Sequence, residues 1–140
     1  MTEPASDPQR SAQRLQWARI QLGDAQAVVE RASVDAGMRS YWRVTGTRGS
    51  HIVMDAPPGL EDPRPWLRMR GLLHDHGLRV PALLAQDLDA GFLLLEDLGG
   101  PTLARILDER NADEWFGRAI DQLLRLQAIP VPADFGQFGE

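Results

Sequence analysis

Few side chains in this sequence are placed to bind a metal ion or to attack a substrate. His74 and His76 flank Asp75, but side chains two positions apart on a helix point to different faces, so we expect a solvated helix end. Asp87 and Asp89 flank a predicted hairpin turn, which aspartate favours without any ligand. We therefore predict no metal ligand in either cluster.

The basic side chains and the absence of cysteine exclude several kinds of chemistry. All 15 basic residues are arginine, so the chain has no ε-amine for a Schiff base or for a phosphate clamp. Without cysteine it forms no disulfide and no thiolate metal site. The formal net charge of -5 provides no basic field, and we expect no nucleic-acid partner.

The length and composition predict one domain or a part of one. The chain has 140 residues, of which 43% are hydrophobic and 25% charged, and this suffices for one sizeable core. Residues 1–10 are polar, and no run approaches the roughly 18 consecutive apolar residues of a membrane span. We expect a cytoplasmic protein with no membrane contact.

Residues 50–66 are the most informative stretch, because they predict a strand, a corner and a helix in direct succession. A β-branched run leads to Ala56, and Pro57 and Pro58 stiffen the corner. Asp62 then caps a helix that has Pro63 at its first position. A strand and a helix joined in this way can form part of a nucleotide-binding lobe.

The rest of the pattern predicts an α+β fold, with five strands and one helix inserted after the third strand. Ser11 caps an earlier helix, which Gly23 ends. The inserted helix begins at Pro63 and ends at Gly77. Runs that contain β-branched or aromatic residues and are bounded by turn residues predict strands at residues 28–34, 40–45 and 51–56. Residues 80–88 and 92–95 flank a turn at residues 89–91 and are predicted as a second hairpin.

Helices are predicted after the glycine pair at residues 99–100. Thr102 caps a short helix, and Asn111 with Glu114 forms a capping-box start for a longer one. The chain thus divides into a flexible lead at 1–10, a first lobe at 11–98, and a hinge with an incomplete helical lobe at 99–140. We expect a truncated second lobe, because the last residues contain no closing element.

The element order and the run FLLLEDLG at residues 92–99 resemble the N-terminal lobe of the aminoglycoside phosphotransferase family, which has a protein-kinase-like fold. Within that family, the runs SYWRV at 40–44 and MDAPP at 54–58 most resemble the bacterial anomeric kinases of N-acetylmuramate and N-acetylglucosamine. The resemblance covers about residues 15–129. It implies transfer of the γ-phosphoryl group of ATP, assisted by Mg²⁺, to a sugar hydroxyl, with a nucleotide and a small sugar as partners.

The resemblance implies an adenine site at the end of the last strand. Leu95 would lie at the back of the pocket, and the backbone carbonyl of Glu96 and the backbone N–H of Leu98, on either side of Asp97, would pair with the adenine edge. The alternative is a buried strand that ends in an exposed acidic turn.

The turn before the second strand would occupy the place of the loop that covers the ATP phosphates. Its backbone N–H groups at Gly37 and Met38, the guanidinium of Arg39 and the hydroxyl of Ser40 could approach a triphosphate. An ordinary hairpin turn, which Asp35 and Gly37 also favour, explains the same residues.

Met54 stands where a kinase-like strand would carry its phosphate-holding lysine. A strand methionine is usually core filler, although it could also line the adenine or ribose site. The helix that follows has no acidic residue between Pro63 and His74 to pair with such a lysine. Asp55 is either an exposed carboxylate at the strand end, which we favour, or a group that orients an arginine.

Catalytic residues of the family are not found in this sequence. Family members carry a His-Gly-Asp loop and a metal-binding aspartate, but no histidine here precedes Gly-Asp. We therefore predict no catalytic residue, no Mg²⁺ ligand and no turnover for these residues alone. A nucleotide-binding pseudokinase or regulatory module, or an α+β interaction domain unrelated to kinases, remain the alternatives.

Overall fold

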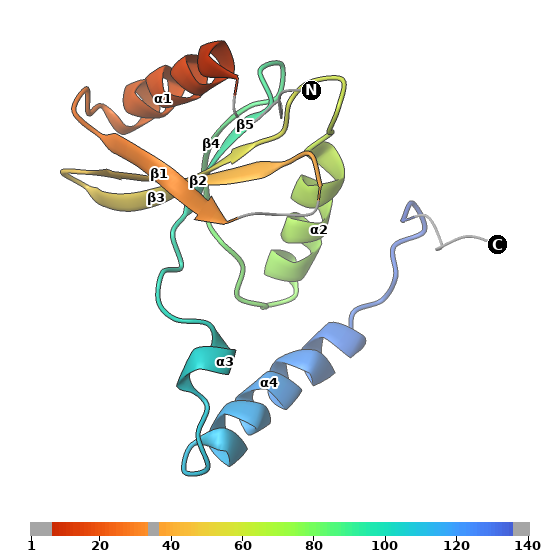
Figure 1. The fold of residues 1–140 in the computed structure, drawn as a ribbon. Helices are drawn as coiled ribbons and strands as arrows, with labels where there is room; N and C mark the ends of the chain where they lie inside the picture. The colour runs from red at the N-terminus through yellow and green to blue at the C-terminus, as the bar shows by residue number, and fades with distance from the viewer. Residues whose placement is uncertain (1–6, 34–36, 136–140) are drawn as a thin grey trace. The chain divides into compact units, whose positions relative to one another are not determined.

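The computed structural model describes residues 7–33 and 37–135 and contains five strands and four helices in those ranges (Figure 1). The α+β class and the inserted helix predicted from the sequence are confirmed. The elements in chain order are α1 Pro8–Leu22, β1 Val28–Ser33, β2 Ser40–Gly46, β3 Gly49–Asp55, α2 Arg64–Asp75, β4 Leu83–Asp87, β5 Phe92–Glu96, α3 Leu103–Ile106 and α4 Ala112–Gln127.

The chain divides into two units. The first comprises Met1–Arg68 and Pro81–Gly99, and the second comprises Met69–Val80 and Gly100–Glu140. The first unit contains the sheet, with strand order β1-β2-β3-β5-β4 and antiparallel pairing throughout. β4 is shorter than the predicted 80–88 strand, and its pairing with β5 shifts register between Leu83 and Ala85.

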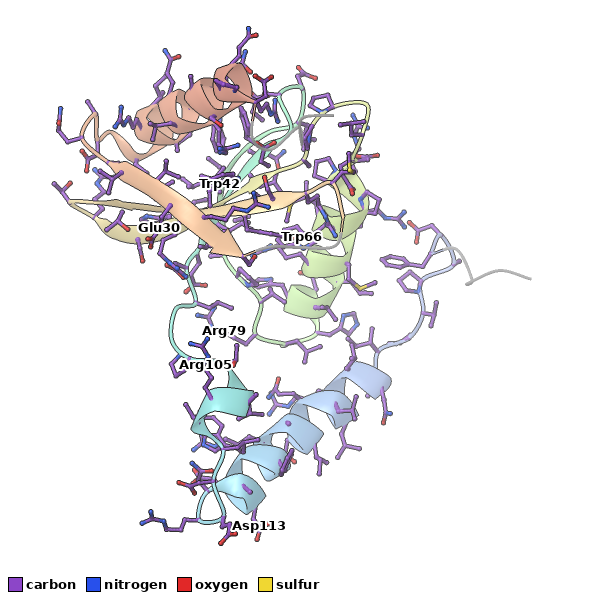
Figure 2. All side chains as sticks on the ribbon, in the orientation of Figure 1. Glu30, Trp42, Trp66, Arg79, Arg105 and Asp113 are labelled. Atoms are coloured by element: carbon purple, nitrogen blue, oxygen red, sulfur yellow. The ribbon has the colours of Figure 1, made fainter. Side chains whose placement is uncertain are left out.

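One face of the sheet is covered by α1 (Figure 1). Ala18 and Leu22 follow one another at the four-residue spacing that places side chains on one side of a helix, and they pack on Val44 of β2 and Val53 of β3. Trp42 lies against the same cluster (labelled in Figure 2). This half of the core therefore joins the N-terminal helix to the centre of the sheet.

The start of α1 differs from the prediction. Asp7 is the N-cap, its side chain accepts a hydrogen bond from the Gln9 N–H at 3.0 Å, and Pro8 occupies the first turn. Ser11, predicted as the cap, lies inside the helix, where its hydroxyl accepts a hydrogen bond from Arg14 at 3.3 Å. Residues 8–10 of the predicted flexible lead are therefore helical; residues 1–6 lie outside the described ranges.

The opposite face of the sheet packs against the first turn of α2. Met54 of β3 and Leu93 and Leu95 of β5 form the centre of this cluster, and Trp66 and Leu67 of α2 pack against it. Trp66 is labelled in Figure 2. Met54 is completely buried. Its side chain thus fills the core, as methionine usually does on a strand.

Asp55, the next residue, faces the α1 side and is completely buried. Its two carboxylate oxygens accept hydrogen bonds from Arg10 and from Arg14, each at 2.7 Å. The exposed carboxylate favoured from the sequence was wrong, and the arginine-orienting alternative is the correct one. Burial lowers the pKa of Arg14, and the hydrogen bond that Arg14 donates to Asp55 opposes that shift.

The two arginines extend this ionic cluster across the α1 face. The Arg10 guanidinium lies 4.1 Å from the centroid of the Phe92 ring and donates a hydrogen bond to the Ala90 carbonyl at 2.6 Å. The Arg14 guanidinium lies 3.7 Å from the centroid of the Trp42 ring. Helix α1 is therefore joined to β2, β3 and the β4–β5 turn by two side chains.

In the second unit, the predicted capping box at the start of α4 does not form. Asn111 is the N-cap residue, but its side chain makes no cap hydrogen bond; it accepts from the Asp108 N–H and donates to the Ile106 carbonyl. Glu114 forms an ion pair with Arg118 at 2.7 Å. The asparagine thus fixes the loop between α3 and α4 and leaves the α4 N–H groups uncapped by its side chain.

Replacing Asp55 by asparagine should destabilise the protein by about 3–5 kcal/mol, because it leaves the buried Arg14 and the partly buried Arg10 without their counter-charge. Urea unfolding followed by circular dichroism measures the change. Asp62→Asn is the matched control, because Asp62 pairs with Arg64 at 3.6 Å on the surface and should cost less than about 0.5 kcal/mol. Equal stabilities of the two variants would contradict the role assigned to Asp55.

Candidate functional site

A pocket of about 300 Å³ lies on the α2 side of the sheet, next to the end of β5. We call it the hinge pocket. Its surface is mostly apolar, with a few polar groups, as in sites for flat organic ligands. The lining residues are Ala32, Ser33, Tyr41, Arg43, Ile52, Trp66, Pro81, Leu95, Glu96, Asp97, Leu98 and Gly99.

Strand alternation explains how the sequence builds these walls. Tyr41 and Arg43 lie two positions apart on β2, and Ile52 pairs with both Arg43 and Leu95 in the register of the sheet. Side chains two apart on a strand, and those directly opposite across a pair, point to the same face. The sheet thus contributes a continuous wall, to which Trp66 of α2 adds an aromatic ring.

The segment after β5 carries the polar groups of the pocket. Asp97 accepts hydrogen bonds from Arg43 Nε at 2.7 Å, from the Ser50 hydroxyl at 2.7 Å and from the Gly99 N–H at 2.9 Å. The Asp97 side chain is only 5% exposed. The hydrogen bond from Arg43 is the main cause that lowers the pKa of Asp97 to about 2, and the same pair raises the pKa of Arg43.

Glu96, the last residue of β5, is fixed by two hydrogen bonds to the backbone of Ala82. Its N–H donates a hydrogen bond to the Ala82 carbonyl at 2.9 Å, and its carboxylate accepts one from the Ala82 N–H at 3.1 Å. Within residues 7–33 and 37–135, no group accepts a hydrogen bond from the Leu98 N–H. The pocket rim therefore offers a backbone donor to a ligand.

The residues predicted to bind phosphate lie elsewhere. Ser40 is completely buried, and its hydroxyl accepts a hydrogen bond from Trp42 Nε1 at 2.8 Å, on the α1 face. The Met38 N–H donates to Glu61 at 3.3 Å. The Nε of Arg39 is buried with no hydrogen-bond partner among the described residues. Asp35, which belongs to the same predicted turn, falls outside those residues.

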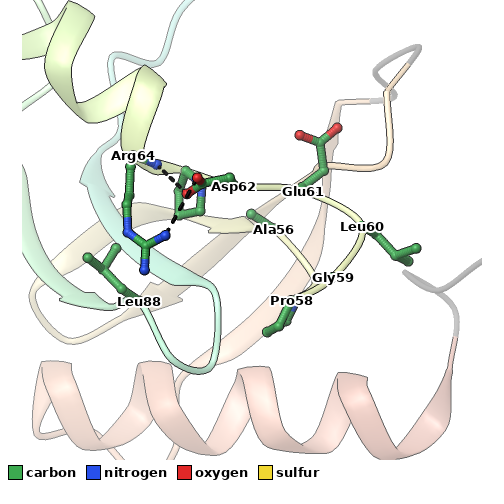
Figure 3. Close-up of a pocket in the computed structure, with 9 residues that line it drawn as sticks. Ala56, Pro58, Gly59, Leu60, Glu61, Asp62, Arg64 and Leu88 are labelled. Carbon is green, nitrogen blue, oxygen red and sulfur yellow. Dashed lines mark hydrogen bonds and ion pairs between the residues drawn. The ribbon is translucent and has the colours of Figure 1, made fainter.

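Glu61 also lines a second pocket of about 460 Å³ at the corner between β3 and α2 (Figure 3). Asp62 and Arg64 face each other there, with 3.6 Å between the guanidinium and the carboxylate, and Asp62 accepts a hydrogen bond from the Arg64 N–H at 3.0 Å. These polar groups satisfy one another. None of the residues predicted to bind a ligand lines this corner pocket.

The structure brings together four of the predicted ligand-binding residues and separates the others from them. Leu95, Glu96, Asp97 and Leu98 line the hinge pocket. The remaining predicted residues are not in its lining, namely Gly37, Met38, Arg39, Ser40 and Met54. Sequence reasoning missed the pocket residues Tyr41, Arg43, Ile52, Trp66 and Pro81, although strand alternation would have placed the first three on one face.

The described residues contain neither a cluster of metal-ligating side chains nor a helix that could span a membrane. Within residues 7–33 and 37–135, no three histidine or acidic side chains gather closely enough to hold a metal ion. In the same part of the chain, no helix has both the length and the apolar character needed to cross a membrane.

Comparison with known proteins identifies the family. Residues 28–140 match the family model described as the phosphotransferase enzyme family. The chain belongs to this family. The match includes every strand of the sheet and the whole segment at 96–99, and the five-stranded sheet agrees with the kinase-like N-terminal lobe that the sequence resembles.

Several curated relatives of this phosphotransferase chain bear the name N-acetylmuramate/N-acetylglucosamine kinase. The protein from Pseudomonas aeruginosa is 50% identical over 100 residues, covering 71% of this chain and 30% of the relative. That from Pseudomonas putida is 40% identical over 124 residues, covering 89% and 35%. That from Neisseria meningitidis is 33% identical over 123 residues, covering 86% and 34%. The chain thus spans about a third of these relatives.

The Asp97 cluster predicts a specific pH dependence of stability. Because the pKa of Asp97 falls from 3.8 to about 2 in the folded state, its contribution is complete above about pH 4 and is lost as the pH falls toward 2. The difference in unfolding free energy between wild type and Asp97→Asn should therefore be constant from pH 5 to 8 and shrink below pH 4. A difference that stays constant down to pH 2 would contradict this assignment.

Proposed function

We propose that this chain is the nucleotide-binding part of an ATP-dependent phosphotransferase that acts on an amino sugar. The sugar is N-acetylmuramate or N-acetylglucosamine, and the acceptor is its anomeric hydroxyl. The observation that carries the proposal is the hinge pocket, which joins apolar walls to backbone polar groups at the end of a central strand.

The pocket residues fit the requirements of an adenine ring. Tyr41, Ile52 and Leu95 offer apolar contact to its faces, and Trp66 supplies a further aromatic surface. The Leu98 N–H is available as a donor to a ring nitrogen, and the Glu96 carbonyl is the proposed acceptor for the amino group. Backbone groups suit this task because they keep their geometry whatever the side chains are.

Phosphate binding and the transfer step remain further parts of the proposal. Arg39, whose Nε has no hydrogen-bond partner among the described residues, and the Gly37 N–H are proposed to approach the phosphates, since this chain has no lysine for the purpose. The γ-phosphoryl group passes to the sugar oxygen, whose proton goes to a base, and ADP leaves. We assign that base and the Mg²⁺ ligands to sequence outside these residues, and the ATP requirement suits a cytoplasmic enzyme.

The proposal predicts that Mg²⁺ and ATP raise the melting temperature of this chain, because a ligand present at 100 times its Kd adds about 2.7 kcal/mol to the unfolding free energy. Ile52→Trp should abolish the shift by filling the pocket. Leu84→Trp is the control, because Leu84 is 53% exposed and does not line the pocket. No shift in the wild type, or equal shifts in all three proteins, would refute the nucleotide site.

A chimera tests the reaction itself. In it, this chain replaces the segment of the Pseudomonas aeruginosa relative that it matches. We expect ATP-dependent phosphorylation of N-acetylmuramate and N-acetylglucosamine, measured by ADP release, and its loss with Ile52→Trp. A chimera that binds ATP but phosphorylates neither sugar would contradict the proposed substrate class and leave the nucleotide site standing.

A further inference from the structure

We propose that Asp97 is a positioning residue for purine binding, which acts by fixing the backbone of residues 96–99 against the sheet. This inference rests on the proposed nucleotide function. It makes purine affinity depend on Asp97, a residue whose side chain does not itself pair with the base. Asp97 lies between the two residues whose backbone groups are proposed to read the adenine edge, so a rotation at Asp97 would displace both groups together.

Three donors from separate segments hold the Asp97 carboxylate. They are Arg43 of β2, the Ser50 hydroxyl at the start of β3, and the Gly99 N–H two residues further along the chain. Hydrogen bonds to an ionised carboxylate are stronger than those between neutral groups. Because the side chain is 5% exposed, water competes little with these donors.

The residues that follow Asp97 would otherwise be free to turn. Gly99 and Gly100 have φ values of 56° and 75°, which lie in the left-handed region. Glycine adopts this region without steric strain and can also adopt many other backbone conformations. The Asp97 carboxylate removes that freedom at Gly99 by binding its N–H. On the other side, the two hydrogen bonds between Glu96 and Ala82 fix the end of β5. The backbone of Leu98 is therefore held from both directions.

Arg43 makes the inference specific, because it lines the pocket as well as holding Asp97. Its side chain is 34% exposed, and its positive charge is paired with Asp97. Removing the Asp97 charge would release Arg43 at the pocket wall, where a cation attracts phosphate. A variant without the Asp97 charge should therefore lose affinity for the adenine base but not for the phosphates. This difference distinguishes misplacement of residues 96–99 from a general weakening of the site.

The experiment compares the wild-type chain with Asp97→Asn and Asp24→Asn. Asp24 is the matched control: its carboxylate also accepts hydrogen bonds from three donors, the Thr47 N–H at 2.8 Å, the Thr47 hydroxyl at 3.2 Å and the Gln26 N–H at 2.9 Å, but it lies outside the hinge pocket. Isothermal titration calorimetry gives the Kd of each protein for ATP, adenosine and inorganic triphosphate. Melting temperatures measure the stability lost by each variant.

Asp97→Asn should weaken ATP and adenosine binding by roughly tenfold and leave triphosphate binding unchanged or tighter. Asp24→Asn should leave all three Kd values within about twofold of wild type, with a comparable loss of melting temperature. Unchanged ATP and adenosine binding in Asp97→Asn would overturn this inference alone. Equal weakening of triphosphate, or the same losses in Asp24→Asn, would also overturn it. Failure of the wild type to bind ATP would overturn the proposed function together with this inference.

Discussion

The first unit of this protein depends on a buried carboxylate that is shared by two arginines. Asp55 has no exposed surface, and a buried charge of this kind is tolerated only when it is paired and hydrogen-bonded. Arg10 and Arg14 satisfy it from successive turns of α1, and each guanidinium also lies over an aromatic ring of the sheet. Since neither charge can be left alone without a large cost, α1, the end of β3 and the β4–β5 turn must assemble together.

A second carboxylate, that of Asp97, is hydrogen-bonded near the start of β3, the strand that ends at Asp55. β3 begins near Ser50, whose hydroxyl donates to Asp97, and ends at Asp55. The strand is thus anchored to the hinge segment at its start and to α1 at its end. The pocket wall at Ile52 lies between these two anchors, so the part of the wall that β3 contributes is held at both ends.

The sequence was sufficient to predict the strands and the inserted helix, because their periodicity, proline positions and turn residues are local signals. The adenine site at residues 95–98 rests on the family resemblance and stays a prediction, although these residues line one pocket. It did not reveal the partners of Asp55, since those arginines lie 41 and 45 positions away and no local pattern records such a pairing. The Ser11 cap was wrong for a related reason: Asp7 with Pro8 makes a stronger start, and the hydroxyl of Ser11 serves Arg14. Arg43 escaped notice because its role depends on Asp97, which is 54 residues distant.

The adjacent residues Met54 and Asp55 face opposite sides of β3, one toward an apolar cluster and the other toward two arginines. A slip of β3 by one residue against its neighbours would exchange these faces, bringing a bare carboxylate into the cluster of leucines and a thioether between two guanidinium groups. Both changes are unfavourable, so Met54 and Asp55 together stabilise the observed register of β3 over a register shifted by one residue. The first two residues of the MDAPP run at 54–58 therefore favour one alignment of β3, on which the geometry of the pocket then depends.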